Sequence, residues 1–116
     1  MGKKIINTNK SPAPIGPYNQ AILKGNTLFI SGQIALDPKS MELNNKTITD
    51  ETHQVMINLK NILNEAKMDF SDVVKSSIFL SDMSLFKSVN EVYGSYLTSG
   101  NEPARETIAV KTLPMN

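Results

Sequence analysis

The chain has 116 residues, of which 40% are apolar, 20% charged and 6% aromatic, which is the length and composition of one globular domain. Twelve Lys and Arg residues against eleven Asp and Glu residues give a net charge of +1, and the charges are interspersed, so the sequence predicts no basic surface for nucleic acid. The absence of cysteine excludes disulfides and thiolate chemistry, and the lone histidine, His53, has no second imidazole with which to form a metal site.

The first half of the chain predicts strands and a stiff loop. The N-terminus has two lysines but no apolar run long enough for a signal peptide or membrane span, so we expect a cytoplasmic protein. Residues 4–7 form a short extended segment, and prolines at positions 12, 14 and 17 then forbid a helix. Residues 21–24 and 27–31 are short β-type runs separated by Gly25 and Asn26, a pair that predicts a hairpin.

The second half predicts two helices and two strands. Apolar residues fall at helical spacing over residues 49–66, with Thr and Asp placed to cap the start. No glycine follows, so either Lys67 adopts a strained left-handed conformation at roughly 1 kcal/mol or the helix end frays. Residues 73–80 predict a buried strand suited to a central position, the spacing from Leu85 to Leu97 predicts a second helix, and residues 107–113 predict a last strand. This order predicts an α+β fold with two helices on one face of a mixed sheet.

Arg105 is the strongest candidate for a binding residue, because Pro103 fixes the approach of the chain to the last strand. A guanidinium held directly before that strand can clamp a carboxylate by two parallel hydrogen bonds. The alternative is a strand-end arginine paired with Glu102 or Glu106.

Three further polar side chains have both a functional and a structural interpretation. Asn90 lies one turn after Phe86 at the edge of an apolar stripe, where most amides are satisfied within a core or an interface. Tyr18, on the proline-rich loop, can offer its hydroxyl to a ligand or simply pack. His53 lies near acidic residues on a solvated helix face, and catalysis by it would need an orienting group that the sequence does not identify.

Four blocks of residues carry a resemblance to a known family. They are Ile15 Gly16 Pro17 Tyr18 with Gln20 Ala21, then Phe29 Ile30 Ser31 Gly32 Gln33, then Asn90 Glu91 Val92 Tyr93, and then Pro103 Ala104 Arg105. In this order and spacing, over residues 5–114, they resemble the Rid (YjgF-like) family of reactive intermediate deaminases, RidA subgroup. The resemblance implies a chorismate-mutase-like α+β domain in a homotrimer with clefts between subunits, which hydrolyses 2-imino and enamine acids to 2-keto acids and ammonia.

The resemblance also implies the site. Arg105 matches the family arginine that binds the substrate carboxylate, while Tyr18, Gly32 and Asn90 match positions that line the cleft, with the backbone at Gly32 approaching the ligand. The substrates implied are small carboxylic acids such as 2-iminobutanoate and 2-iminopropanoate, the latter formed from 2-aminoacrylate; no cofactor, metal, nucleic acid or membrane is implied. An iminium carbon is already electrophilic, so such an enzyme need only hold the carboxylate, orient a water and move protons.

The sequence departs from the family pattern in two places. Glu106 and Thr107 stand where family members commonly have a small residue and then often Cys; the charge of Glu106 would weaken the clamp if it faced the same side as Arg105, and strand alternation argues that it does not. The family pattern also continues past Leu113 Pro114 into a strand with a Glu implicated in positioning water. We therefore expect residues 1–116 to be a single Rid-type domain lacking that strand, with the catalytic group unassigned.

Two other functions stay open. A non-catalytic binder of small carboxylates would keep Arg105 and the cleft without an acid or base, and the missing terminal Glu favours this interpretation. An RNA-cleaving or translation-inhibiting role, a label sometimes given to family members, has little support from a near-neutral charge without a basic aromatic surface.

Overall fold

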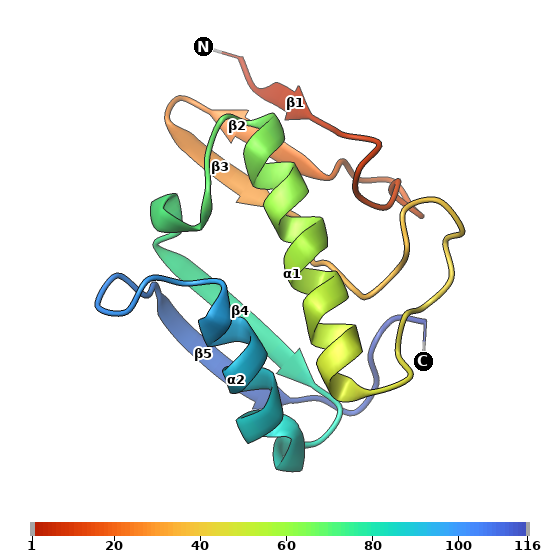
Figure 1. Cartoon of the computed structure of the whole chain (residues 1–116). Coiled ribbons are helices and arrows are strands. Elements are labelled where there is room, and N and C mark those ends of the chain that lie inside the picture. Colours follow the sequence, from red (N-terminus) through yellow and green to blue (C-terminus); the bar gives the residue numbers. More distant parts are fainter. Residues whose placement is uncertain (1, 116) are drawn as a thin grey trace.

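The computed structural model describes residues 2–115, which form five strands, two α-helices and two short 3₁₀ turns (Figure 1). Their order is β1 (Lys4–Ile6), β2 (Ala21–Lys24), β3 (Thr27–Ile30), α1 (Ile48–Glu65), β4 (Lys75–Leu80), α2 (Phe86–Ser95) and β5 (Ala104–Ala109). The 3₁₀ turns, Phe70–Asp72 and Met83–Leu85, precede β4 and α2. Both helices lie on the same side of the strands (Figure 1), which confirms the predicted α+β class.

The first sheet contains the predicted hairpin. Strands β2 and β3 pair antiparallel, with Ala21 opposite Ile30 and Lys24 opposite Thr27, and β1 pairs antiparallel with β2. Gly25 has a φ of +59°, which glycine adopts without steric cost and which the common two-residue hairpin turns require at their first central position. The Gly25–Asn26 pair therefore sets the register of this sheet.

A hydrophobic core lies between α1 and the first sheet. Ile6 from β1, Ala21 from β2 and Ile62 from α1 are buried together, and further apolar side chains pack against them: Leu23, Leu28, Ile30 and Ala66. Because successive strand residues face opposite sides, Ile5 and Phe29 lie on the face away from α1, where they are 52% and 63% exposed. The first sheet thus has one covered and one open apolar face.

Helix α1 begins and ends within a residue of the prediction. The side-chain oxygen of Thr47 accepts a hydrogen bond from the backbone N–H of Asp50 at 3.0 Å and caps the start. At the other end Lys67 has a φ of 61°, and the N–H of Met68 donates to the carbonyl of Leu63 at 2.9 Å. Of the two predicted outcomes for this glycine-free end, the left-handed Lys67 is the one adopted, and the closing hydrogen bond offsets its strain.

The prediction of a buried, central strand over residues 73–80 is wrong. A capped 3₁₀ turn occupies Phe70–Asp72, Val74 is 82% exposed, and β4 begins only at Lys75. Within the described chain β4 pairs with β5 alone, and its residues alternate between exposed and more buried positions. The apolar run that suggested burial belongs to a strand with one solvent-facing side, on which Phe79 is 52% exposed.

The prediction of the last strand over residues 107–113 starts too late. Strand β5 begins at Ala104, whose N–H donates to the carbonyl of Val74 at 3.1 Å and opens a parallel ladder with β4. Arg105 therefore lies inside a strand rather than before it. Alternation along β5 then places Arg105 and Thr107 on one face and Glu106 on the other.

We expected one sheet, but residues 2–115 form two separate sheets. The first has the order β1-β2-β3 and the second contains β4 and β5, so β3 and β4 each keep a free edge (Figure 1). The two helices contact each other; α1 packs on the first sheet, and Asn90 of α2 bonds to Arg105 of the second. None of the helices in this part of the chain has the length and apolarity to span a bilayer.

Candidate functional site

Arg105 is held on the face of β5 that α2 covers. In the parallel ladder its Cα is paired with that of Ser76 on β4, so the two side chains leave the sheet side by side. Its Nη1 donates a hydrogen bond to Oδ1 of Asn90 at 2.6 Å. The pairing of Arg105 and Asn90, both predicted site residues, joins β5 to α2.

Two aromatic rings flank the guanidinium of Arg105. Its Cζ lies 5.2 Å from the ring centroid of Tyr93 and 5.5 Å from that of Phe86. Phe86, Asn90 and Tyr93 are spaced i, i+4 and i+7 along α2, so all three face β5. Because seven helical residues rise about 10 Å, a cation this close to both rings lies between them.

The pairing of Arg105 with Glu102 or Glu106 is wrong. The carboxylate of Glu102 accepts from the backbone N–H of Gly100 at 2.9 Å, and Glu106 faces the opposite side of β5, where it forms an ion pair with Lys75 and accepts from Ser77 at 2.8 Å. These two contacts, the one with Lys75 foremost, lower the pKa of Glu106 below its ordinary value. The negative charge of Glu106, which would weaken carboxylate binding by Arg105, is thus paired on the other face of β5, as strand alternation predicted.

Only one of the five N–H donors of Arg105 has a hydrogen-bond partner within residues 2–115, namely the one facing Asn90. A guanidinium that lies over two aromatic rings, and whose other N–H donors have no partner in this part of the chain, can bind a planar anion through two parallel hydrogen bonds. The arrangement therefore suits a carboxylate.

Tyr18 and Gly32 line a second feature, a cavity of about 80 Å³ between the proline-rich loop and the segment after β3. A Cβ added at Gly32 would meet nothing within 4 Å, so a ligand can approach the backbone there. The hydroxyl of Tyr18 accepts from the backbone N–H of Ile15 at 3.2 Å, and its ring packs over Gly16. Tyr18 is 45% exposed, so the loop presents it at the surface.

Two buried amides hold the walls of this cavity. Gln20, 2% exposed, accepts from the N–H of Thr8 and donates to the carbonyls of Ser11 and Pro12. Asn58 of α1 is fully buried, and its side-chain amide donates to the carbonyls of Ile34 and Leu36. The backbone carbonyl of Asn58 accepts a hydrogen bond from the Ser11 hydroxyl. Backbone groups that no strand satisfies are thus paired by side chains, which fixes the loop conformation.

The predicted site residues therefore form two pairs, Tyr18 with Gly32 and Asn90 with Arg105. The first pair belongs to the β1–β3 half and the second to the β4–α2–β5 half, and neither Asn90 nor Arg105 lines the cavity of Tyr18. Sequence reasoning missed the residues that frame Arg105: it assigned Phe86 and Tyr93 to an apolar stripe. The sequence did contain one indication of this role, because Phe86 and Tyr93 flank Asn90 on the same face of the predicted helix.

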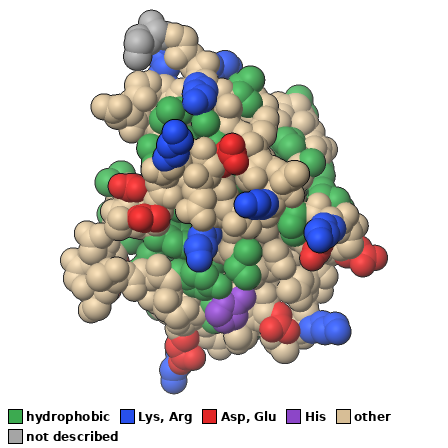
Figure 2. Space-filling view, turned by 45° about the horizontal axis from the view of Figure 1, so that its top comes forward, with side chains coloured by type: hydrophobic (Ala, Val, Ile, Leu, Met, Phe, Trp, Pro, Cys, Tyr) green, Lys and Arg blue, Asp and Glu red, His purple; other side chains and the backbone are tan. Residues whose placement is uncertain are grey.

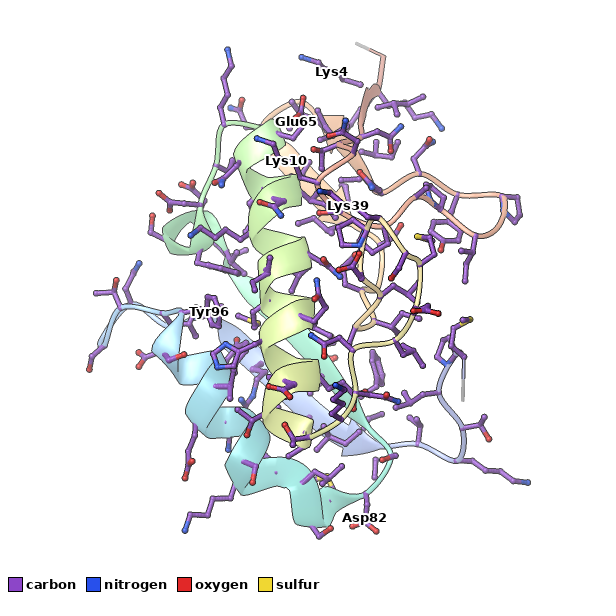
Figure 3. The ribbon with its side chains drawn as sticks, turned by 45° about the vertical axis from the view of Figure 1, so that its right-hand side comes forward. Lys4, Lys10, Lys39, Glu65, Asp82 and Tyr96 are labelled. Carbon is purple, nitrogen blue, oxygen red and sulfur yellow. The ribbon has the colours of Figure 1, made fainter. Side chains whose placement is uncertain are left out.

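Two remaining polar groups have clear surroundings. His53 Nδ1 lies 2.8 Å from the hydroxyl of Tyr96, and their rings meet edge to face. Tyr96, labelled in Figure 3, caps the C-terminal end of α2, so this contact links α1 to the end of α2. Burial raises the pKa of the Tyr96 hydroxyl.

The hydroxyl of Thr107, on the Arg105 face of β5, is buried without a partner in the described part of the chain. Among residues 2–115 no group of three or more His, Cys, Asp or Glu side chains could hold a metal ion.

Comparisons with known proteins give the family. The family model described as Endoribonuclease L-PSP matches residues 8–116. The chain is 45% identical over 112 residues to the 2-iminobutanoate/2-iminopropanoate deaminase of Mus musculus, covering 97% of this chain and 82% of that protein. The crystal structure of RidA from the Antarctic bacterium Psychrobacter matches with a TM-score of 0.92 at 40% identity, covering 97% of this chain and 89% of the other. That of Escherichia coli TdcF with bound serine matches with a TM-score of 0.90 at 32% identity, with the same coverage. The resemblance of the four sequence blocks is thereby confirmed, and the chain belongs to the Rid (YjgF-like) family.

Proposed function

We propose that this protein hydrolyses reactive 2-imino and enamine acids, such as 2-iminobutanoate and 2-iminopropanoate, to 2-keto acids and ammonia. The observation that carries the proposal is Arg105, which bonds to Asn90 and whose remaining N–H donors have no partner within the described residues 2–115. Two relatives support it: the mouse protein is named for this activity, and TdcF binds serine, which carries a carboxylate beside an amino carbon. Removal of reactive metabolites would be the role of such a reaction.

In the proposed reaction Arg105 binds the substrate carboxylate through two parallel hydrogen bonds. Water adds to the electrophilic iminium carbon and forms a carbon–oxygen bond while the carbon–nitrogen π electrons move to nitrogen. A proton then passes from the added water to that nitrogen, the carbon–nitrogen bond breaks, and ammonia leaves as the keto group forms. The remaining hydroxyl proton passes to the departing ammonia, which leaves the site as ammonium. Much of the rate enhancement would come from holding the reactants in position, since the carbon needs little activation.

We further propose that the site is completed in a homotrimer, across the interface between subunits. Large apolar side chains are exposed on the strand faces away from the helices: Ile5, Phe29, Phe79 and Ile108. Phe79 and Ile108 are neighbours in the β4–β5 register, and exposed apolar side chains that lie together often mark an interface. Association would also allow the Tyr18–Gly32 cavity of one copy to meet the Asn90–Arg105 pair of another. Sedimentation equilibrium at micromolar concentration tests this: we expect a trimer, and a monomer contradicts the intersubunit site.

The test of the reaction is release of ammonia and 2-keto acid from freshly generated 2-aminoacrylate. We expect the Arg105→Lys variant to lose about 10- to 100-fold in kcat/KM with folding intact, because an ammonium cannot reproduce the bidentate geometry. Circular dichroism serves as the folding control. Unchanged turnover by Arg105→Lys would remove the carboxylate clamp from the mechanism.

The second candidate is a non-catalytic binder of small carboxylates. It is favoured by one observation: the acidic residue next to Arg105 in sequence, Glu106, faces the other side of β5 and is engaged by Lys75 and Ser77. Binding of 2-oxobutanoate without ammonia release from 2-aminoacrylate would support this candidate over the deaminase. We do not propose RNA binding, since the face shown in Figure 2 mixes basic and acidic side chains.

A further inference from the structure

Two residues outside the predicted site, Tyr93 of α2 and Ser76 of β4, meet beside Arg105. Their hydroxyl oxygens are hydrogen-bonded at 2.6 Å, and the Tyr93 ring centroid lies 5.2 Å from the guanidinium carbon of Arg105. Ser76 is also the strand partner of Arg105 in the β4–β5 register. One tyrosine therefore contacts the arginine through its ring and the arginine's neighbour through its hydroxyl.

We propose that Tyr93, anchored by Ser76, is a positioning residue that fixes the plane of the Arg105 guanidinium for carboxylate binding. This inference rests on the proposed function, because it describes how its carboxylate clamp is oriented. Neither Tyr93 nor Ser76 is placed against the substrate; both act through Arg105.

The physical argument begins with the freedom of an arginine side chain. A long, flexible side chain loses roughly 1.5–2 kcal/mol of rotamer entropy when it is fixed, and this loss weakens ligand binding unless the free protein already holds the side chain in place. A single hydrogen bond to Asn90 leaves the guanidinium free to rotate about that bond. Rings on both sides restrict this rotation, because a guanidinium stacks on an aromatic face.

The two rings are not equally secured. Phe86 is 38% exposed and has no polar group with which to hold its orientation. Tyr93 is half-buried, and its hydroxyl is tied to Ser76, whose place is set by the β4–β5 ladder. Tyr93 is therefore the fixed wall against which the guanidinium is oriented.

The helix offers a matched control. Tyr96, three residues after Tyr93, also has a hydrogen-bonded hydroxyl, but its partner is His53 on α1 (Figure 3). A Tyr96→Phe variant removes a hydroxyl contact at the C-terminal cap of the same helix without touching the surroundings of Arg105. Any effect common to both tyrosines is a general loosening of α2.

The test measures binding of 2-oxobutanoate, a stable keto-acid product, by isothermal titration calorimetry. We expect Tyr93→Phe and Ser76→Ala each to weaken affinity about fivefold, the factor that one net hydrogen bond typically carries, and their double variant to be no weaker than either single variant, since both break the same bond. Tyr96→Phe should lower the melting temperature and leave the affinity unchanged. In an Arg105→Lys background, Tyr93→Phe should change kcat/KM by less than about twofold, since the planar group it orients is gone.

The outcomes separate this inference from the proposed function. Arg105→Lys weakening binding while Tyr93→Phe and Ser76→Ala bind normally would overturn the inference and keep the carboxylate clamp. An equal loss in Tyr96→Phe would also overturn it, because a general loosening of α2 would then explain the effect. Failure of the unaltered chain to bind 2-oxobutanoate would overturn both.

Discussion

The two halves of the molecule are stabilised in different ways. The half formed by α1 and the β1–β3 sheet has a packed apolar core, and its loops are held by buried amides whose hydrogen bonds are satisfied. The half formed by β4, α2 and β5 buries less and holds a guanidinium between two rings, on the same strand face as a buried hydroxyl that has no partner among residues 2–115. The first half therefore fixes a backbone shape, whereas the second holds a guanidinium whose N–H donors are engaged, among residues 2–115, only at Asn90.

The largest expected effect is on the well-satisfied half. Asn58 is fully buried, and replacing it by Leu removes the donor to the carbonyl of Leu36 and the acceptor of the Gln54 amide, whereas the carbonyl of Ile34 still accepts from the N–H of Leu36. We expect a loss of about 3 kcal/mol or more in the free energy of unfolding, because each buried unsatisfied group costs about 1–3 kcal/mol. Urea denaturation measures it. Asn61→Ala, on the same helix, removes a bond near the surface and should cost under about 1 kcal/mol; equal losses would mean that the amide network has no special weight.

The next largest effect would come from joining the two halves. The free edges of β3 and β4 can each accept a further strand. We expect a chain extended beyond Asn116 by a family-like strand bearing a Glu to melt at a higher temperature and to deaminate faster by about 10²-fold, the lower end of general acid–base contributions. The same strand with Gln should raise the melting temperature equally and leave the deamination rate unchanged. Identical rates for the Glu and Gln extensions would show that this carboxylate has no catalytic duty.

A smaller effect concerns the buried hydroxyl of Thr107 in the second half. Thr107→Val removes the buried hydroxyl that has no partner among residues 2–115, with little change of shape. Since an unsatisfied hydroxyl is costly to bury, the variant should be more stable by about 1 kcal/mol. Thr107→Ser is the matched control because it keeps the hydroxyl. A destabilised Thr107→Val would imply that a water or a partner subunit satisfies this group.

The smallest effect is the response to acid. The carboxylates of Asp69 and Asp82 accept hydrogen bonds from Ser71 and Ser84, which lowers the pKa of both. A lowered pKa means that the stabilisation is present above the ordinary value of about 3.9 and is lost as the pH falls through the folded-state pKa. Asp69→Asn with Asp82→Asn keeps a side-chain oxygen as the cap and should flatten the decline in melting temperature between about pH 5 and pH 2. An unchanged dependence of melting temperature on pH would mean that other carboxylates cause the loss of stability in acid.

Sequence reasoning succeeded where the cause is local. The turn at Gly25, the Thr47 cap region and the strained end at Lys67 all follow from the conformational preferences of a few neighbouring residues. Strand boundaries around Val74 and Ala104 were wrong, because pairing between β4 and β5 decides them and single-segment patterns do not report the partner.

The candidate site was foreseen in part for the same reason. Arg105 and Asn90 were named separately, yet the bond between them depends on how α2 docks on β5. Phe86 and Tyr93 have the spacing of side chains on the buried face of a helix. Their sequence pattern therefore does not show whether they pack in an apolar core or against the guanidinium of Arg105. Alternation along β5 did foretell that Glu106 faces away from Arg105, since that relation needs no knowledge of the partner strand.

The ring of Tyr93 beneath Arg105 gives the protein an optical reporter. The chain has no tryptophan and three tyrosines, so its intrinsic fluorescence comes from Tyr18, Tyr93 and Tyr96 alone. Two of these lie at the two parts of the candidate site, and the third is bonded to His53. A Tyr96→Phe protein would therefore emit only from the vicinity of Arg105 and of the proline-rich loop, and occupancy of either part could be followed in unlabelled protein by the intensity of tyrosine emission.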